Sequence, residues 1–391
     1  MTRPALELAD IFRLHGPAYR RTHSLPAHQH QLMRAIESCR TAALGGHVEE
    51  CGQCQHTRIS YNSCRNRHCP KCQGKERSEW LEQRKSELLP AEYFHVVFTL
   101  PPPVAAIAYQ NKTVVYGILF RAAAETLLAI ARDPKHLGAE IGFFAILHTW
   151  GQSLQHHPHL HCVVPGGGLS PDYDRWMACR PGFFLPVRVL SRLFRRLFLE
   201  ELQQAFDQNK LRFFSELEPL REAKAWAAYL KPVREAEWVV YAKPPFGGPE
   251  QVLAYLARYT HRVAIGNQRL ASMQNDQVSF RWKDYKHRNR IRTMTLEADE
   301  FIRRFLLHAL PPHFQRIRYY GFLANAHRRE KLALCRKLLI SDPTGLLPLI
   351  VVAAAVAGAI PAPDPRLCPV CRTGAMARIE TLPRQAGIDS S

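Results

Sequence analysis

Histidines and tyrosines at two places in the chain could act together on a phosphodiester. His159 and His161 lie in a strand-like run over residues 157–164, and residues two apart on a strand point to the same side, so both can bind one metal ion. Tyr255 and Tyr259 lie four apart on a predicted helix and also share a side. A metal that polarises a phosphate, next to a phenol that can attack it, is suited to cutting a DNA strand and holding its end.

This chemistry needs further groups around the two pairs. A divalent ion requires at least a third protein ligand or oxygens of the substrate, and Gln152, His157 and His148 are the candidate protein ligands. Imidazole binds several divalent ions, so the histidines do not fix which ion is bound. A free phenol has a pKa near 10, so metal charge and the neighbouring Arg258 and Arg262 would have to aid its deprotonation.

The cysteines predict a structural zinc site. Cys51 and Cys54 form one Cys-x-x-Cys pair, and Cys69 and Cys72 form another, with fourteen residues between the two pairs. Two such turns can complete a closed tetrahedral site for Zn²⁺. We therefore expect these four thiolates to bind one ion.

Other possible ligands remain without an assigned place. Cys64 and His68, between the two pairs, could replace a ligand or contribute to a second site. Cys368 and Cys371 form half a zinc site near the end of the chain. Ligands from another part of the chain could complete this site, or it could stay without metal.

Composition indicates a nucleic-acid partner. The 391 residues include 53 Lys and Arg against 34 Asp and Glu, which gives a formal charge of +19. A polyanion is the simplest partner for such a chain, and nucleic acid is favoured over membrane. The start of the chain lacks the features of a secretory signal, and the cysteine usage is typical of a reducing compartment. The apolar run 346–360 is too short for a membrane span.

The pattern of elements predicts an α+β fold with an antiparallel sheet, because strands and helices mix without a strict βαβ order. Expected helices cover residues 29–41, 75–89, 113–132 and 187–210, and expected strands cover 94–100, 143–148, 158–164 and 237–242. We expect a helical zinc-binding domain over 1–90, a catalytic domain over 91–340, and a tail over 341–391 with an apolar helix and the last Cys-x-x-Cys pair.

A basic stretch over residues 281–292 interleaves positive charge with aromatic side chains. Single-stranded DNA favours such surfaces, since bases stack on rings while phosphates meet cations. The candidate DNA-binding residues here are Arg281, Lys283, Lys286, Arg288 and Arg290.

Three short motifs resemble those of HUH nucleases, in which U is a bulky apolar residue. They are Phe98-Thr99-Leu100, then His159-Leu160-His161, then Tyr255-Leu256-Ala257-Arg258-Tyr259. Over about residues 10–340 the chain resembles the rolling-circle transposases of insertion-sequence family ninety-one, which combine these motifs with a zinc knuckle. The resemblance implies an HUH-nuclease domain with a central antiparallel sheet flanked by helices.

The resemblance also implies a mechanism and a setting. His159 and His161, with Gln152 as the third ligand, would hold Mg²⁺ or Mn²⁺. Tyr259 or Tyr255 would attack the scissile phosphate and leave a 3′-hydroxyl and a 5′-phosphotyrosine bond. The substrate would be single-stranded DNA at the element ends and target, in the bacterial cytoplasm near the nucleoid.

Three other functions share some of these features. The series His157, His159 and His161 also resembles the histidine-triad nucleotide hydrolases, which use a histidine nucleophile and no metal. A plasmid relaxase or replication initiator would share the tyrosine chemistry. A zinc-containing DNA-binding protein without enzymatic activity would need neither tyrosine.

Overall fold

The computed structural model describes residues 6–243, 264–284, 287, 289–341 and 367–385, without the side chains of residues 73–78. Several predicted features lie outside these ranges. They are Tyr255, Tyr259, Arg258, Arg262, Lys286, Arg288 and the apolar run 346–360.

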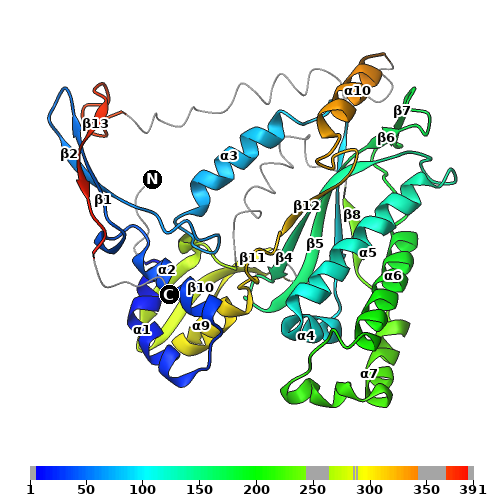
Figure 1. The fold of residues 1–391 in the computed structure, drawn as a ribbon, viewed down its shortest axis with the longest axis horizontal. Helices are drawn as coiled ribbons and strands as arrows, with labels where there is room; N and C mark the ends of the chain where they lie inside the picture. Colours follow the sequence, from blue (N-terminus) through cyan, green and yellow to red (C-terminus); the bar gives the residue numbers. More distant parts are fainter. Residues whose placement is uncertain (1–5, 244–263, 285–286, 288, 342–366, 386–391) are drawn as a thin grey trace.

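A five-stranded antiparallel sheet forms the centre of the larger part of the molecule (Figure 1). Its strand order is β12-β4-β5-β3-β8. The bounds are β3 Tyr93–Thr99, β4 Gly142–Trp150, β5 His156–Pro165, β8 Val240–Lys243 and β12 Ile317–Gly321. Four of these strands were predicted to within a few residues, and the antiparallel α+β class is confirmed. The edge strand β12, a short run of five residues, was missed.

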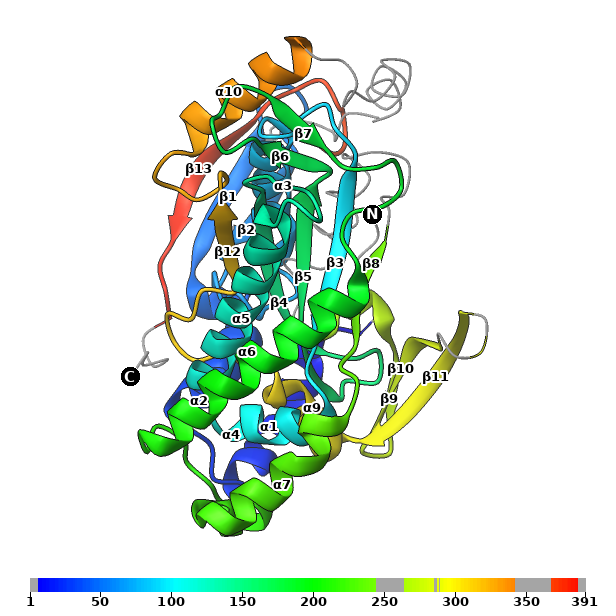
Figure 2. The same cartoon turned by 90° about the vertical axis from the view of Figure 1, so that its right-hand side faces the viewer.

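Helices α4 Pro102–Gln110, α5 Lys112–Arg132 and α6 Val187–Asp207 cover one face of this sheet (Figure 2). Helix α7 Ala223–Glu235 packs against α6, where Trp226 stacks on Phe206 at 4.5 Å. The strand residues pointing to this face are apolar and join the largest hydrophobic cluster, in which Phe98 meets Phe194 at 4.9 Å between ring centroids. The opposite face of the same strands combines buried apolar side chains, such as Phe144 and Ile146, with histidines.

Helix α5 is long and apolar enough to cross a membrane by length and composition alone. In this fold 72% of its most apolar window is buried against the sheet and α6. Its hydrophobicity is accounted for by its place in the core of the protein.

The N-terminal helices pack against residues from the second half of the chain. Helices α1 Leu8–Thr22 and α2 Ala27–Ser38 lie beside α9 Ala298–Leu307 and the sheet β11-β10-β9. The strands of that sheet are β9 Leu270–Gln274, β10 Gln277–Asp284 and β11 Arg290–Glu297. Phe12 of α1 and Phe305 of α9 meet edge to face at 5.5 Å, and both are fully buried.

A second three-stranded sheet joins the two ends of the described chain. β1 Gly46–Cys51 lies between β2 Thr57–Tyr61 and β13 Met376–Leu382. The N-terminal region contains the predicted helical segments α2 and α3 Gln73–Lys85, and the sheet is an element that the sequence analysis did not predict.

The remaining elements are short or lie at the rim. They are η1 Ala42–Leu44, β6 Gly167–Leu169, β7 Trp176–Ala178, η2 Ser215–Arg221, η3 Asn267–Arg269 and α10 Arg328–Ser341. A third hydrophobic cluster joins residues near α3 to α10 and to the inner strands β3, β4 and β5 of the central sheet. The second and third clusters thus both contain residues from either side of position 90, so packing does not follow that predicted domain boundary.

Candidate metal centres and active site

The strand register gathers histidines on the face of the central sheet opposite to α4, α5 and α6. In the β4–β5 ladder His148 is opposite His159, and in the β3–β5 ladder His161 is opposite Val97. The side chains of His148, His159 and His161 therefore point to one side. One ring nitrogen from each of the three lies within 4.8 Å of the others, which is close enough to share a metal ion.

Hydrogen bonds orient two of these rings for metal binding. His159 Nδ1 lies 2.6 Å from the carbonyl oxygen of His157, so this nitrogen carries the proton and donates it. His161 Nδ1 lies 2.6 Å from Nε2 of His95, which comes from β3. If His161 donates to His95, the Nε2 atoms of His159 and His161 both keep a lone pair for a cation. Metal-binding histidines usually have such partners on their other nitrogen.

Burial keeps these imidazoles neutral at physiological pH. Desolvation lowers the pKa of His159 to about 4 and that of His95 to about 4. It lowers the pKa of His161 well below the usual value of about 6.5. Because only the neutral ring can bind a metal, the cluster is in its ligand form without needing a nearby carboxylate.

His148 supplies the third nitrogen of the cluster, whereas Gln152 lies in the loop that follows β4. The Gln152 side-chain oxygen accepts a hydrogen bond from the backbone N–H of Lys283 in β10, at 3.5 Å. As a metal ligand Gln152 stays a prediction. His157, the other candidate, contributes its backbone carbonyl to the orientation of His159.

The cysteines form two separate groups of four. The first consists of Cys39, Cys64, Cys69 and Cys72, and the second consists of Cys51, Cys54, Cys368 and Cys371. Within each group the sulfur atoms all lie within 4.8 Å of one another, and the eleven cysteines of the chain are free thiols.

The predicted zinc site made of Cys51, Cys54, Cys69 and Cys72 is therefore wrong in its pairing. Cys51 ends β1 and Cys54 lies in the turn to β2, whereas Cys69 and Cys72 precede α3. The six-residue strand β1 carries the first pair about 17 Å along the hairpin, since a strand rises about 3.4 Å per residue. Each pair instead meets two cysteines that sequence spacing did not connect with it.

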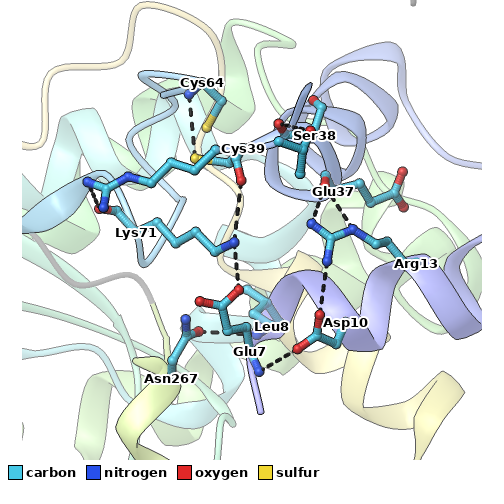
Figure 3. Close-up of polar contacts among 12 residues, drawn as sticks. Glu7, Leu8, Asp10, Arg13, Glu37, Ser38, Cys39, Cys64, Lys71 and Asn267 are labelled. Carbon is cyan, nitrogen blue, oxygen red and sulfur yellow. Dashed lines mark hydrogen bonds and ion pairs between the residues drawn. The ribbon is translucent and has the colours of Figure 1, made fainter. Parts of the chain in front are cut away.

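The first cluster is held against the beginning of α1 (Figure 3). Lys71 forms an ion pair with Glu7 at 2.6 Å and donates to the carbonyl oxygen of Cys39 at 3.3 Å. The backbone N–H of Cys64 points to the Cys39 sulfur at 3.5 Å. The loop that carries three of the four thiols is thereby fixed to both N-terminal helices.

Two basic residues of the same loop bind the backbone of the segment that precedes β12. His68 Nε2 accepts a hydrogen bond from the N–H of Leu310 at 3.1 Å, so His68 is engaged in packing and lies outside the cysteine groups. Arg67 donates to the carbonyl oxygens of Phe314 and Pro311 at 2.6 and 2.7 Å. These contacts connect the first cluster to the central sheet.

The second cluster has strong backbone support on its C-terminal side. The N–H groups of Thr373 and Gly374 lower the pKa of Cys371 to about 5. A thiolate is the form that binds zinc, so this half of the cluster is prepared for a cation.

The predicted DNA-binding stretch forms the hairpin β10–β11. Arg281 and Lys283 are two apart on β10 and point to one face of it, and both are exposed. Trp282 points the other way, towards the second hydrophobic cluster. Arg290, opposite Asp284, lies on the same side as Trp282 near the hairpin end and is exposed. The strand alternation thus separates the cations of β10 from the aromatic ring between them.

Comparison with known proteins gives the family of the chain. Residues 142–331 match a family model described as a putative transposase, and residues 11–100 match one described as a transposase zinc-binding domain of the IS91 type. The putative transposase y4qJ of Sinorhizobium fredii is 67% identical over 340 residues, which are 87% of this chain and 85% of that protein. The chain belongs to the IS91-type transposase family.

One more sequence relative and one solved structure are also similar to this transposase. The transposase for insertion sequence element IS801 of Pseudomonas savastanoi is 28% identical over 74% of this chain and 68% of that protein. A solved structure of TrwC complexed with a 27-mer DNA covers 62% of this chain and 73% of its own, at 15% identity and a TM-score of 0.23.

The two family matches divide the sites of the transposase unequally. The zinc-binding match contains all of the first cysteine group but only Cys51 and Cys54 of the second. The transposase match contains His148, His159 and His161, whereas His95 lies before it. Sequence reasoning did not single out His95 or Cys39, because only the strand register and the end of α2 bring them to their clusters.

Proposed function

We propose that this transposase nicks and joins single-stranded DNA through a 5′-phosphotyrosine intermediate during rolling-circle transposition, as an HUH-type strand transferase. The observation that carries the proposal is the cluster of three histidines on one face of an antiparallel sheet, in a chain of the IS91-type family. Two of the three are the histidines of the His-Leu-His motif.

The reaction proposed is an exchange of phosphate esters. The phenol oxygen of Tyr259 forms a bond to phosphorus while the bond from phosphorus to the 3′-oxygen breaks, and the proton lost by the phenol balances the one gained by the 3′-hydroxyl. One phosphodiester replaces another, so rejoining needs no nucleotide cofactor. Tyr255 supplies a second phenol for a second exchange.

His148, His159 and His161 would hold the divalent ion, Mg²⁺ or Mn²⁺, with Gln152 as a further candidate ligand. When bound, such an ion supplies positive charge that polarises the scissile phosphate. The protein's own part is to keep the imidazoles neutral by burial and to fix their rings, through the His157 carbonyl and His95.

The DNA would lie along the basic hairpin. Exposed Arg281, Lys283 and Arg290 can meet phosphates. We propose the same role for Arg258, Arg262, Lys286 and Arg288, which accompany them in the sequence. The setting proposed is the bacterial cytoplasm, at the nucleoid.

The test is formation of a covalent protein–DNA adduct. The full chain is incubated with labelled single-stranded DNA that carries the ends of its element, with Mn²⁺ or Mg²⁺, and then denatured. We expect a labelled adduct that disappears with a chelator and in the double variant Tyr255→Phe/Tyr259→Phe. The single variants show which phenol acts first.

One further variant separates this function from the histidine-triad alternative. Because His157 acts here through its backbone carbonyl, His157→Ala should keep adduct formation, whereas His159→Ala/His161→Ala should lose it. Loss of activity in His157→Ala, with a label attached to histidine, would support the hydrolase. Unaltered DNA binding with no adduct under any condition would support a DNA-binding protein without enzymatic activity.

A further inference from the structure

The second cysteine group connects the N-terminal region, which a family match covers, with a C-terminal segment that lies outside both matches. Cys51 Sγ lies 3.6 Å from Cys371 Sγ, and Cys54 Sγ lies 3.6 Å from Cys368 Sγ. The partners are 320 and 314 residues apart in sequence. Cys368 and Cys371 lie beyond both matched ranges, 11–100 and 142–331.

We infer that these four thiolates form a second structural zinc site, which fastens the C-terminal strand β13 to the N-terminal hairpin β1–β2. A tetrahedral zinc with Zn–S bonds of about 2.3 Å places its sulfurs about 3.8 Å apart. The observed separations of 3.6 Å fit that edge and are far from the roughly 2.05 Å of a disulfide. The site is complete only in the full chain.

The two Cys-x-x-Cys turns that meet at this site have the same construction. The N–H of Gln55 bonds to the Cys51 carbonyl at 3.0 Å, and the N–H of Arg372 bonds to the Cys368 carbonyl at 2.9 Å. Gln55 and Arg372, each directly after the second cysteine, have left-handed φ values of 56° and 61°. A tight turn with this geometry aims both of its sulfurs at one point, as a metal knuckle requires.

Backbone N–H groups also point at the sulfurs from both sides. Gln53 N lies 3.4 Å from Cys51 Sγ, Val370 N lies 3.4 Å from Cys368 Sγ, and Gly374 N lies 3.3 Å from Cys371 Sγ. Hydrogen bonds of this kind stabilise the charged form of an acceptor. These N–H groups thus stabilise negatively charged sulfurs. Uncharged thiols would not need such donors.

Gly374 shows how closely the two ends approach. A Cβ atom at this position would lie 2.4 Å from Cys51 Sγ, well inside van der Waals contact. The neighbouring Thr373 hydroxyl donates to the Gln53 side chain at 2.6 Å. Directly beyond this contact, Met376 of β13 pairs with Cys51 of β1, so the metal site lies at the end of the strand ladder and sets its register.

The test is the zinc content of the full chain, measured by native mass spectrometry and elemental analysis. We expect two zinc ions per chain in the wild type and one in Cys368→Ser/Cys371→Ser. Cys64→Ser/Cys69→Ser, in the first cluster, should also retain one. The matched control Cys179→Ser changes a half-buried cysteine outside both groups and should retain two.

Two measurements on the wild type test the second zinc site even if a cysteine variant does not fold. X-ray absorption at the zinc edge should show sulfur ligands only, at about 2.3 Å. Hydrogen exchange after mild chelation should rise in residues 376–382 and 46–51 while β3, β4 and β5 stay protected. A wild type with a single zinc, or a Cys368→Ser/Cys371→Ser variant that keeps two, would overturn the site. These outcomes are independent of strand cleavage.

Discussion

His95 illustrates how a residue outside the histidine motif can control a metal site. It is buried on β3, and its Nε2 atom is 2.6 Å from Nδ1 of His161. The contact fixes which nitrogen of His161 faces the cluster. His95 is therefore a positioning residue, and its effect should be on metal affinity before any effect on DNA binding.

Replacement of His95 by alanine should weaken Mn²⁺ binding by about 10- to 100-fold, the usual cost of losing such a partner. Titration calorimetry of the full chain measures this change. His95→Gln, whose amide oxygen can accept the same hydrogen bond, should recover part of the affinity. His136→Ala, at an exposed histidine, is the control. Equal affinity in all of these proteins would exclude a positioning role.

His308 should make the protein less stable in mild acid. Burial lowers its pKa to about 3, and its ring bonds to Thr149 and to the Leu154 carbonyl. Since the folded-state pKa lies below the unfolded value of about 6.5, the unfolded chain takes up the proton first as pH falls. Stability from this group is thus present above about pH 6.5 and is lost towards pH 3, by at most about 1.4 kcal/mol per pH unit.

Denaturant unfolding at pH 7, 6 and 5 tests this effect. His308→Gln should be less stable than the wild type at pH 7 but should show a shallower decline with acid. Parallel declines in the two proteins would mean that His308 titrates normally in the folded state.

At the scale of elements, the strands were the most predictable feature and their partners the least. Alternation along residues 157–164 correctly put His159 and His161 on one side of a strand. His148 was only one of several candidate ligands, because its position depends on the β4–β5 register, which includes an irregularity between His148 and Trp150. Local patterns specify which way a side chain points, but pairing between distant strands determines what it meets.

The β10–β11 hairpin should contribute electrostatically to DNA binding. Arg281→Ala/Lys283→Ala/Arg290→Ala should weaken binding of single-stranded DNA, and the slope of log affinity against log salt should become shallower by about 2, at roughly 0.7 per lost phosphate contact. Fluorescence anisotropy over a salt series measures both quantities.

A control with the same change in charge is available on the other side of the molecule. Arg188→Ala/Arg192→Ala/Lys210→Ala removes three exposed cations on and just beyond α6, which covers the opposite face of the central sheet. It should leave the salt slope nearly unchanged. If both triple variants behave alike, the hairpin provides only general charge.

Helix α1 should contribute to stability through one buried ring. Phe12→Ala removes the edge-to-face contact with Phe305 and should cost about 3–5 kcal/mol, with a lower thermal midpoint. Leu14→Ala on the same helix, where the side chain is 63% exposed, should change stability by less than about 0.5 kcal/mol. Similar losses in both variants would place α1 outside the cooperative core.

At the scale of the whole molecule, long-range contacts override the order of segments along the chain. The second hydrophobic cluster joins α1 and α2 to residues 264–309, and the two cysteine groups divide a set that spacing alone had joined. Cys39 belongs to no Cys-x-x-Cys pair, and the Cys368–Cys371 pair was recognised as half a zinc site, but its remote partners could not be identified from sequence distance. Metal sites built from remote segments require the tertiary fold before their members can be identified.

The pairing of β1 with β13 also has a consequence for synthesis of the protein on the ribosome. Cys51 is made 320 residues before Cys371, and translation at about 5 to 20 residues per second separates them by roughly 16 to 64 s. During that interval the edge of β1 lacks its partner strand β13, and Cys51 and Cys54 lack the other two cysteines of their site. The sheet that begins with β1 and β2 is therefore among the last parts of the molecule to be completed, although these two strands are translated early.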